Sequence, residues 1–425
     1  MNQLIKIPKV HISQSLLPES KSILIRVLFI TAFLNRSTTL TKINFNEDIK
    51  VMITALKQLG KTIYYTPSQL TIHNTNIHTT LANTIQLKNS GITARIMCVF
   101  AMLLGKKNLT LIGTKQLYKR PFKETIKICS KLLRNNPICF LKHRNQLPIK
   151  VIHTPQLKLP KILHITCKYS SQTLTALLII LPLIIKKKLT IKIKQVVSVP
   201  YIKLVTTLLK KFNINIIYNS NIVIYPGKYK LKTPITKLIE KDNSAVPYYI
   251  FNRLDKACRL QISSKTLTST QKEIKIIKIL NSLGFKLTPH APTHLKCYRH
   301  TPNVKYLTVN CSEIIDTAML LPTLIINNVK KIKLYNIYNW NFKECKRITA
   351  LNKELKKLGL KTKKGNNWIK IHCYKLRNNA IIDTYKDHRM VLSMFQYSNK
   401  CNIVINNPNN IKKTFPNFLK QCLTS

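Results

Sequence analysis

Six stretches of the chain space their apolar residues as an amphipathic helix does. Several end on Leu-Gly or a similar pair and lead into an apolar segment typical of a β-strand, as Val51–Gly60 does before Lys61–Tyr65. The stretches begin near residues 51, 123, 201, 272, 348 and 414. Successive starts are about 70 residues apart, which is longer than a common solenoid repeat. The pattern therefore predicts a repeated α/β unit of several strands and helices.

The pattern also argues against two kinds of protein. No Gly-x-Gly-x-x-Gly follows a predicted strand, so a dinucleotide-binding domain is not expected. The longest apolar run, Leu174–Ile185, contains Thr175 and Pro182 and is too short to cross a bilayer. With 425 residues, 45% of them hydrophobic, the chain can bury a large core and is long enough for two or more domains.

The charge of the chain suggests a polyanionic partner at first. Lys and Arg number 71 against 14 Asp and Glu, which gives a formal charge of +57. The lysines, however, are spread among Ile, Leu and Asn in every segment, without a zinc finger, a basic arm or an RNA-binding aromatic motif. We therefore expect no specific nucleic-acid partner, and only weak binding to polyanions at low salt.

Cysteine and histidine usage indicates neither disulfides nor a metal. The 11 cysteines include no Cys-x-x-Cys pair, so they are expected to be buried in a reducing compartment. His290, His294, Cys297 and His300 have spacings found in some metal sites, but prolines interrupt the helix that would align them. We favour a polar surface loop there, with no metal and no cofactor.

The segment Asn339–Arg347, which reads Asn-Trp-Asn-Phe-Lys-Glu-Cys-Lys-Arg, carries the densest group of polar side chains. At the start of a helix its cations, carboxylate and amide can face one pocket. Five more polar segments occur along the chain: Ser20–Ser22 with Arg26, Asn89–Gly91 with Arg95, Arg120–Pro121, Ser170–Gln172 and Asp387–Arg389. Together the six segments resemble, in their order, the signatures of the EPSP synthase family of enolpyruvyl transferases.

The resemblance implies a two-domain inside-out α/β barrel. Each domain would contain three βαβαββ units, six in all, with helices inside and sheets outside. Residues 1–20 and 236–425 would form a discontinuous first domain, and residues 21–235 the second. The active site would lie in the interdomain cleft, where helix N-termini attract phosphate and carboxylate groups. A monomer is expected.

The resemblance also implies two substrates, phosphoenolpyruvate and shikimate 3-phosphate. Each carries a phosphate and a carboxylate, which suit several fixed cations and the planar fork of arginine. The expected phosphoenolpyruvate-binding residues are Lys21, Asn89, Gly91, Arg120, Gln172, Arg347, Arg389 and Lys413. Those expected to bind shikimate 3-phosphate are Lys21, Ser22, Arg26, Ser170, Ser171, Gln172, Ser198, Tyr201, Asp316, Asn339 and Lys343.

Three residues fall on the positions of the family's proton-transfer groups. In the family's reaction the 5-hydroxyl of shikimate 3-phosphate loses a proton as it attacks C2 of phosphoenolpyruvate, C3 gains a proton, and phosphate then leaves. We assign the hydroxyl proton to Asp316 and the C3 proton to Glu344 and Lys21. The arginines would stabilise charge on the departing phosphate. Asp316 can also serve as a helix cap without losing this role.

Two alternatives share the fold. The sister enzyme that acts on UDP-N-acetylglucosamine is expected to carry a cysteine in the loop before the Arg-Pro motif, and Gly113–Pro121 has none. The second alternative is a relative whose sequence has drifted, which no longer catalyses the reaction and which binds polyanions through its charge. Its support comes from departures from the family pattern: Glu19 for glycine, Leu24 and Ile25 for small polar residues, Ile315 for proline and Lys346 for an acidic residue.

Two further expectations come from the same resemblance. The segment Val10–Leu17 resembles the strand before the Ser-Lys-Ser motif, so we expect no targeting peptide and a cytoplasmic protein. The family inhibitor glyphosate competes with phosphoenolpyruvate and needs room beside an Asn-Ala-Gly-Thr segment. Here Ile92 replaces that threonine, which predicts reduced glyphosate sensitivity.

Overall fold

The computed structural model describes residues 17–41, 43–75, 82–105, 107–252, 258–261, 271–289, 294–298, 304–327, 329–373 and 375–423. The chain folds into two compact units, which are described separately. The N-terminal unit is Glu19–Ile239, and the C-terminal unit holds Leu17, Pro18 and the described residues from Glu240 onward. His290, His300 and most of the Val10–Leu17 segment lie outside the described residues.

The described residues of the N-terminal unit form three sheets and a group of helices. The helices are α1 (Lys21–Thr31), α2 (Glu47–Gln58), α3 (Gly91–Leu104), α4 (Lys115–Tyr118), α5 (Lys123–Ser130), α6 (Gln172–Ile184), α7 (Val199–Lys211) and the 3-10 helix η1 (Ile235–Lys237). The strands are β1 (Thr38–Thr41), β2 (Ile63–Tyr65), β3 (Gln69–Ile72), β4 (Thr84–Gln86), β5 (Thr110–Ile112), β6 (Ile138–Phe140), β7 (Ile149–Val151), β8 (Ile162–Cys167), β9 (Leu189–Val196), β10 (Ile216–Tyr218) and β11 (Ile222–Ile224). The sheet orders are β1-β3-β2, β4-β5-β7-β6 and β10-β11-β9-β8.

The C-terminal unit also contains three sheets among its described residues, ordered β12-β14-β13, β15-β16-β18-β17 and β19-β20. Its helices are α8 (Val246–Phe251), α10 (Ile276–Ser282), α11 (Arg347–Lys357), α12 (His388–Phe395) and α13 (Phe418–Leu423), with 3-10 helices η2 (Lys272–Lys275), η3 (Ala318–Asn327), η4 (Tyr338–Phe342), η5 (Gln396–Asn399) and η6 (Pro408–Lys413). Its strands are β12 (Cys258–Gln261), β13 (Lys286–Pro289), β14 (His294–Tyr298), β15 (Tyr306–Asn310), β16 (Lys331–Tyr335), β17 (Lys361–Lys364), β18 (Trp368–His372), β19 (Ala380–Ile382) and β20 (Ile403–Ile405).

Parallel pairs within mixed sheets define how the helices connect the strands. β4 and β5 pair in parallel across α3, β8 and β9 across α6, and β15 and β16 across η3. A parallel pair needs such a crossover, whereas the consecutive antiparallel pairs β6/β7, β10/β11 and β17/β18 are joined without a helix. The α/β class predicted from the sequence is therefore confirmed. Helices α2, α5, α7 and α11 occupy four of the predicted amphipathic stretches, η2 with α10 a fifth, and α13 begins slightly later than predicted.

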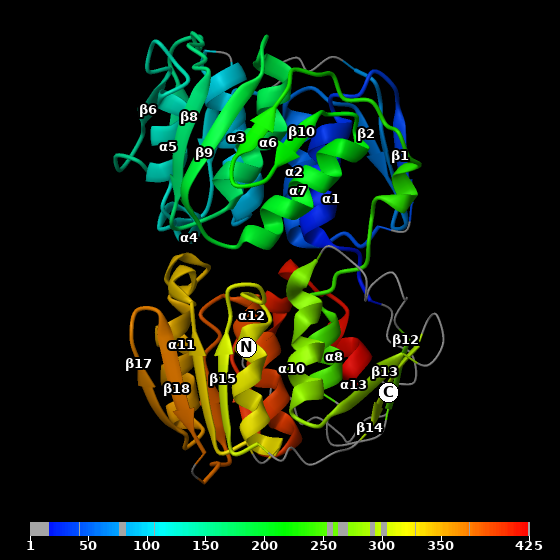
Figure 1. Ribbon diagram of the computed structural model, residues 1–425, viewed down its shortest axis with the longest axis vertical. Coiled ribbons are helices and arrows are strands. Elements are labelled where there is room, and N and C mark those ends of the chain that lie inside the picture. The colour runs from blue at the N-terminus through cyan, green and yellow to red at the C-terminus, as the bar shows by residue number, and fades with distance from the viewer. Residues whose placement is uncertain are drawn as a thin grey trace. The chain divides into compact units, whose positions relative to one another are not determined.

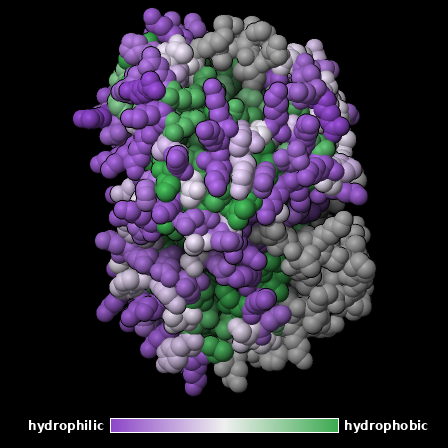
Figure 2. Space-filling model, turned by 45° about the horizontal axis from the view of Figure 1, so that its top comes forward, coloured by the Kyte–Doolittle hydropathy of each residue, from purple (hydrophilic) through white to green (hydrophobic). Residues whose placement is uncertain are grey.

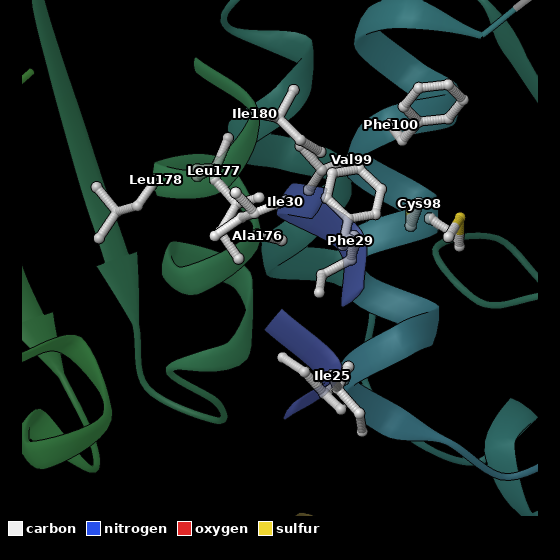
Figure 3. Packing of buried hydrophobic residues seen from close by; sticks show 14 of the residues in the cluster. Ile25, Phe29, Ile30, Cys98, Val99, Phe100, Ala176, Leu177, Leu178 and Ile180 are labelled. Carbon is white, nitrogen blue, oxygen red and sulfur yellow. The ribbon is translucent and has the colours of Figure 1, made fainter. Parts of the chain in front are cut away.

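The core of the N-terminal unit forms where α1, α3 and α6 pack together. In Figure 3, Phe29 and Ile30 of α1 point toward Val99 of α3 and Ala176 of α6. These helices are apolar on nearly every side, as expected for helices surrounded by other elements. Leu24 and Ile25 are fully buried in this core, so the apolar residues that depart from the family pattern have a packing role.

In each unit, sheets flank the helices. Figure 1 shows α3 and α6 in the middle of the N-terminal unit, with β8 and β9 on one side and β1 and β2 on the other. Hydrophilic side chains cover much of the face seen in Figure 2. Across the described ranges, none of the helices has the length and apolar character needed to cross a membrane.

Candidate functional site

The predicted site residues of the C-terminal unit meet around one buried arginine, Arg347, the first residue of α11. Its Nε donates to Asp387 Oδ2 at 2.8 Å, its Nη1 to Asp316 Oδ1 at 3.0 Å, and its Nη2 to Glu344 Oε2 at 3.1 Å. Burial acts to lower the pKa of Arg347, but the charges of Asp387, Glu344 and Asp316 outweigh burial and hold that pKa well above its usual range. One guanidinium therefore fixes three carboxylates.

Asp316, which precedes η3, lies among three cations. Its Oδ1 accepts hydrogen bonds from Lys343 Nζ at 3.2 Å and from Arg347, and its Oδ2 lies 4.0 Å from Arg389 Nη2. Burial acts to raise the pKa of Asp316, but the charges of Lys343, Arg389 and Arg347 outweigh burial and hold that pKa well below its usual range. Asp316 is therefore ionised at neutral pH.

Glu344 is positioned by two cations of different type. Lys413 Nζ, at the end of η6, donates to Glu344 Oε1 at 2.8 Å, while Arg347 occupies the other oxygen. The motif Asn339–Arg347 does not form one continuous helix start, because the 3-10 helix η4 ends at Phe342 and α11 begins only at Arg347. The intervening bend carries Lys343 and Glu344. Asn339 is buried, and the neighbouring Trp340 donates its Nε1 hydrogen to Ile315 O at 2.7 Å.

Arg389 is held by residues that the sequence motifs did not reveal. Its Nη2 donates to Ser244 Oγ at 2.9 Å and its Nη1 to Tyr248 Oη at 3.2 Å. The guanidinium carbon also lies 5.6 Å from the ring centre of Tyr248 and 5.7 Å from that of Phe415. Ser244 and Tyr248 are more than 140 residues from Arg389 in the chain, so no local spacing could have indicated them.

Asp387 and Glu273 are two further carboxylates for which the sequence motifs indicated no role. Asp387 is fully buried, accepts two hydrogen bonds from Arg347, and caps α12 by accepting from Arg389 N at 2.9 Å. The sequence signal for Asp387 was its place beside Arg389 in the polar segment Asp387–Arg389. Glu273 of η2 accepts from Asp316 N at 3.4 Å and from Thr317 N at 3.2 Å, so it holds the backbone that carries the Asp316 side chain.

Glu273 should make the stability of the protein depend on pH. Burial, together with the nearby charge of Asp316, raises the pKa of Glu273 from 4.5 to about 7. Between these values the folded protein holds a proton that the unfolded chain releases, so stability falls as the pH rises through this window. We expect Glu273→Gln to remove this fall, which is on the order of 3 kcal/mol.

Unfolding by urea at several pH values between 4.5 and 7.5 measures this effect. Glu313→Gln is the matched control, since the Glu313 carboxylate is half exposed and pairs with the partly exposed Lys275. Parallel pH profiles for Glu273→Gln and the unsubstituted protein would show that Glu273 does not titrate in this range.

In the N-terminal unit, α1 presents three of the predicted residues. Lys21 forms an ion pair with Asp48 of α2 at 3.0 Å, an acidic partner that the sequence motifs did not suggest. Arg26 donates through Nη1 to Ser22 O and through Nη2 to Thr175 Oγ1 at 3.4 Å. Burial lowers the pKa of Arg26 to about 10, which still leaves the guanidinium charged at neutral pH. The ring of Tyr201 lies 6.0 Å from it.

A second group of residues lies where α3 and α6 begin. Arg95 donates through Nη1 to Gln172 Oε1 at 3.1 Å and to Gly91 O at 3.2 Å, and through Nη2 to Pro121 O at 3.1 Å. Burial, followed by the charge of Arg120, lowers the pKa of Arg95 to about 10. A side chain at Gly91 would clash with Arg120 Nη1, so only glycine allows this arginine its position.

The other predicted residues of this unit lie at loop ends and helix starts. Ser170 Oγ accepts from Gln172 N at 3.2 Å, and Ser171 is the residue before α6. Ser198 precedes α7 with a left-handed backbone (φ 55°), an uncommon conformation for a residue other than glycine. Asn89 donates to Gln116 Oε1. Within the described residues, no cluster of three or more His, Cys, Asp or Glu has a geometry that would hold a metal ion.

Comparisons with known proteins point to one family. The sequence model of the family described as EPSP synthase (3-phosphoshikimate 1-carboxyvinyltransferase) matches residues 11–422. The 3-phosphoshikimate 1-carboxyvinyltransferase of Shewanella loihica is 31% identical over 98% of this chain and 97% of its own length. The enzyme of that name from Buchnera aphidicola subsp. Cinara cedri is 33% identical over 95% of this chain and 92% of its own length.

Solved structures show a similar fold. An EPSP synthase from Acinetobacter baumannii superposes with a TM-score of 0.74 at 17% identity, covering 98% of this chain and 96% of that one. The enolpyruvyl transferase NikO from Streptomyces tendae gives a TM-score of 0.69 at 10% identity, covering 100% and 95% of the two chains.

Proposed function

Because the chain belongs to the EPSP synthase family, we propose that it is a 3-phosphoshikimate 1-carboxyvinyltransferase. It transfers the enolpyruvyl group of phosphoenolpyruvate to the 5-hydroxyl of shikimate 3-phosphate and releases phosphate. This reaction belongs to the shikimate pathway, which leads to chorismate and the aromatic amino acids. The observation that carries the assignment is the Arg347 group, in which one buried guanidinium contacts Asp316, Glu344 and Asp387.

The charges around Arg347 suit two anionic substrates. Four cations, Lys343, Arg347, Arg389 and Lys413, lie next to Asp316, Glu344 and Asp387, and they supply the positive charge to which phosphate and carboxylate groups bind. In the N-terminal unit the guanidiniums of Arg26, Arg95 and Arg120 are buried. Buried cations with few anionic neighbours bind phosphate and carboxylate groups strongly, because little water screens them. We assign the cations around Arg347 and the buried arginines of the N-terminal unit to the same two substrates.

Asp316 accepts the proton of the 5-hydroxyl. Its ionised carboxylate is available as an acceptor, and its low pKa makes it a weak base toward a free alcohol. The hydroxyl becomes strongly acidic as its oxygen bonds to C2 of phosphoenolpyruvate, so the proton moves late, together with formation of that bond. Glu273 keeps Asp316 in place by binding the backbone N–H groups of Asp316 and Thr317.

Glu344 and Lys21 supply the proton that C3 gains. Arg347 and Lys413 both donate to Glu344 and hold its two carboxylate oxygens in place. The same two cations bind the phosphate and carboxylate of phosphoenolpyruvate. Glu344 therefore lies next to the substrate at the step where C3 is protonated. One hydrogen of the resulting methyl group leaves C3 as a proton when phosphate is expelled, and Glu344 takes it up.

We also propose the architecture, domain bounds, oligomeric state and location of the protein. The chain forms six βαβαββ units in a two-domain inside-out barrel, with residues 1–20 and 236–425 in one domain and residues 21–235 in the other. The protein is a cytoplasmic monomer and needs no cofactor. Three sheets per unit, with helices packed among them, support this architecture.

The direct test is phosphate release by the purified protein. Release should require both phosphoenolpyruvate and shikimate 3-phosphate, and it should stop when either is omitted. UDP-N-acetylglucosamine, the acceptor of the sister enzyme, should not replace shikimate 3-phosphate. Release with UDP-N-acetylglucosamine, or no release with any acceptor, would contradict the proposal.

Gly91→Ala should weaken the use of phosphoenolpyruvate. The added Cβ would clash with Arg120 Nη1 and lie 3.3 Å from Gln172 Oε1, so the Arg120 guanidinium must move. We expect the KM for phosphoenolpyruvate to rise about tenfold or more, with a smaller change in the KM for shikimate 3-phosphate. Gly227→Ala is the control, since its Cβ would meet only the flexible end of Ile214. Equal KM values in both variants would show that Arg120 does not contact phosphoenolpyruvate.

Ile92→Thr should increase sensitivity to glyphosate. Ile92 is buried in the first turn of α3, next to Gly91, and isoleucine is bulkier there than the threonine usual in the family and lacks its hydroxyl. We expect the inhibition constant of glyphosate to fall severalfold in the variant while the KM for phosphoenolpyruvate changes less. An unchanged inhibition constant would rule out this explanation of the segment.

A further inference from the structure

The strands of the sheet β15-β16-β18-β17 belong to the C-terminal unit (Figure 1). The register and burial of these strands give the sheet one apolar face and one cationic face. Successive side chains of a strand point to opposite faces, and residues paired across strands share a face. Ile332, Leu334, Ile369 and Ile371 lie on one face and are buried against the unit. Their neighbours in sequence form the solvent face, which we call the lysine–aromatic face.

Five lysines occupy the lysine–aromatic face. The register pairs Lys333 with Lys370 and Lys370 with Lys363, while Lys331 and Lys361 both lie opposite His372. The four strands contain no aspartate or glutamate. Burial and the charges of four of these lysines lower the pKa of His372. Like charges placed directly opposite one another destabilise a sheet, so this arrangement has a cost for folding alone.

Aromatic rings lie between the lysines. Tyr306 is 62% exposed, and Lys331 Nζ lies 4.9 Å from the centre of its ring. Lys370 Nζ lies 5.5 Å from the ring centre of Trp368, and Lys333 Nζ lies 6.0 Å from that of Tyr335. Each accessible ring is thus bordered by an ammonium group, an arrangement that offers a stacking surface beside a positive charge.

This combination is not a general property of the chain's sheets. In the sheet β10-β11-β9-β8 of the N-terminal unit, the matching solvent face pairs Ile162 with Thr190, Thr190 with Val223 and Val223 with Ile217. Ile162 and Ile217 are 44% and 45% exposed, and one paired lysine, Lys192, lies on this face opposite His164. A uniform drift of the composition toward lysine would have enriched both faces to a similar degree, so the five lysines of the lysine–aromatic face reflect a local pattern.

We propose that the lysine–aromatic face binds single-stranded nucleic acid without sequence specificity. Lysines neutralise phosphates along the strand, and unstacked bases pack on exposed aromatic rings of a sheet. A duplex keeps its bases stacked internally and could use only the charges. A phospholipid surface would favour apolar side chains that insert below the headgroups, and this face offers polar or cationic groups around each ring. The proposal concerns a second activity and does not depend on the enzymatic one.

Binding to a fluorescently labelled oligouridylate of about twelve nucleotides, measured by anisotropy at about 50 to 200 mM salt, tests the proposal. The variant carries Lys331→Gln, Lys363→Gln and Lys370→Gln. The control carries Lys186→Gln, Lys187→Gln and Lys188→Gln, which are exposed in the N-terminal unit and remove the same charge. We expect the first to bind at least about tenfold more weakly and to lower the salt slope by about 2, since each lost contact to a single strand contributes about 0.7. The control should change affinity less than about twofold.

A second measurement separates base stacking from charge. Tyr306→Ser should weaken oligouridylate binding about fivefold or more, and it should leave binding to heparin, a polyanion without bases, unchanged. The chain has only two tryptophans, and Trp340 is fully buried, so quenching of tryptophan fluorescence by the oligonucleotide reports on Trp368. Unchanged thermal midpoints would show that the variants remain folded.

Four outcomes would overturn the proposal. The control could lose as much affinity as the variant, which would mean that total charge alone drives binding. Tyr306→Ser could leave oligouridylate binding unchanged, or a duplex of equal length could bind as tightly, and either result would exclude stacking. Phosphatidylserine vesicles could bind through the same lysines more tightly than the oligonucleotide does, which would identify a membrane surface instead.

Discussion

Asp316→Asn is expected to lower kcat at least about a hundredfold and to change the affinity for shikimate 3-phosphate much less. Asparagine keeps the shape of the side chain and can still accept a hydrogen bond from Lys343 or Arg347, but it cannot take up the hydroxyl proton. Steady-state phosphate release and calorimetric binding of shikimate 3-phosphate measure the two effects separately.

Glu344→Gln tests the other proton-transfer step in the same assay and should lower kcat by a similar factor. Glu313→Gln is its control, since the Glu313 side chain lies at the surface of the same unit and contacts Lys275. The thermal midpoint of each variant shows whether the loss arises from unfolding. Near-normal kcat in Asp316→Asn and Glu344→Gln would exclude both residues as proton carriers.

Local sequence signals located much of the site because the residues that contact each other often lie within one motif. Lys343, Glu344 and Arg347 fall within five residues, and the structure brings all three to Asp316 or to one another. The amphipathic pattern likewise located α2, α5, α7 and α11, since burial on one side of a helix leaves a periodic trace in the sequence, whereas α1, α3 and α6 are buried on nearly every side and leave no such trace. Both kinds of signal are short-range.

The supporting residues could not be found in this way because their contacts are long-range. Glu273 binds the backbone at residues 43 and 44 positions away, and Tyr248 contacts Arg389 across 141 positions. Neither residue belongs to a dense polar motif. Arg95 belongs to one of the polar segments, yet its contact with Gln172 spans 77 positions. Its role in holding the Gln172 amide is therefore visible only in the folded structure. The sequence signal for Glu273, Asp48 and Asp387 was the scarcity of acidic residues, since the chain has only 14 and each one is a candidate partner for a cation.

The Leu24 and Ile25 departures show a further limit of motif comparison. Their replacement of small polar residues looked like erosion of a binding motif, but both side chains are fully buried and pack in the core of the N-terminal unit. Ile315 is also buried, and its carbonyl oxygen accepts the Trp340 Nε1 hydrogen. A position inside a motif can therefore change for reasons of packing while the neighbouring polar residues keep their contacts.

Asp387→Asn is expected to cost the C-terminal unit about 3 kcal/mol of unfolding free energy. The carboxylate and the Arg347 guanidinium are both buried and joined by two hydrogen bonds, so removing the negative charge leaves a buried cation with less compensation. Asparagine keeps the oxygen that caps α12 and accepts from Arg347 Nη2, but its NH2 group replaces the oxygen that accepts from Arg347 Nε, so that hydrogen bond is lost together with the charge. Asp316 and Glu344 still contact Arg347, which places the loss at the lower end for a broken buried pair.

The matched control is Asp383→Asn, four positions earlier in the chain. Asp383 pairs with Lys357 at 3.0 Å, but its side chain is 44% exposed, and an ion pair in contact with water contributes about 1 kcal/mol or less. Both tryptophans, Trp340 and Trp368, belong to the C-terminal unit, so their fluorescence during urea unfolding reports on this unit alone. Equal losses in the two variants would mean that Arg347 does not need Asp387 to remain buried. A larger loss in Asp387→Asn, accompanied by a fall in kcat, would show that the group that fixes the catalytic carboxylates also stabilises the fold of this unit.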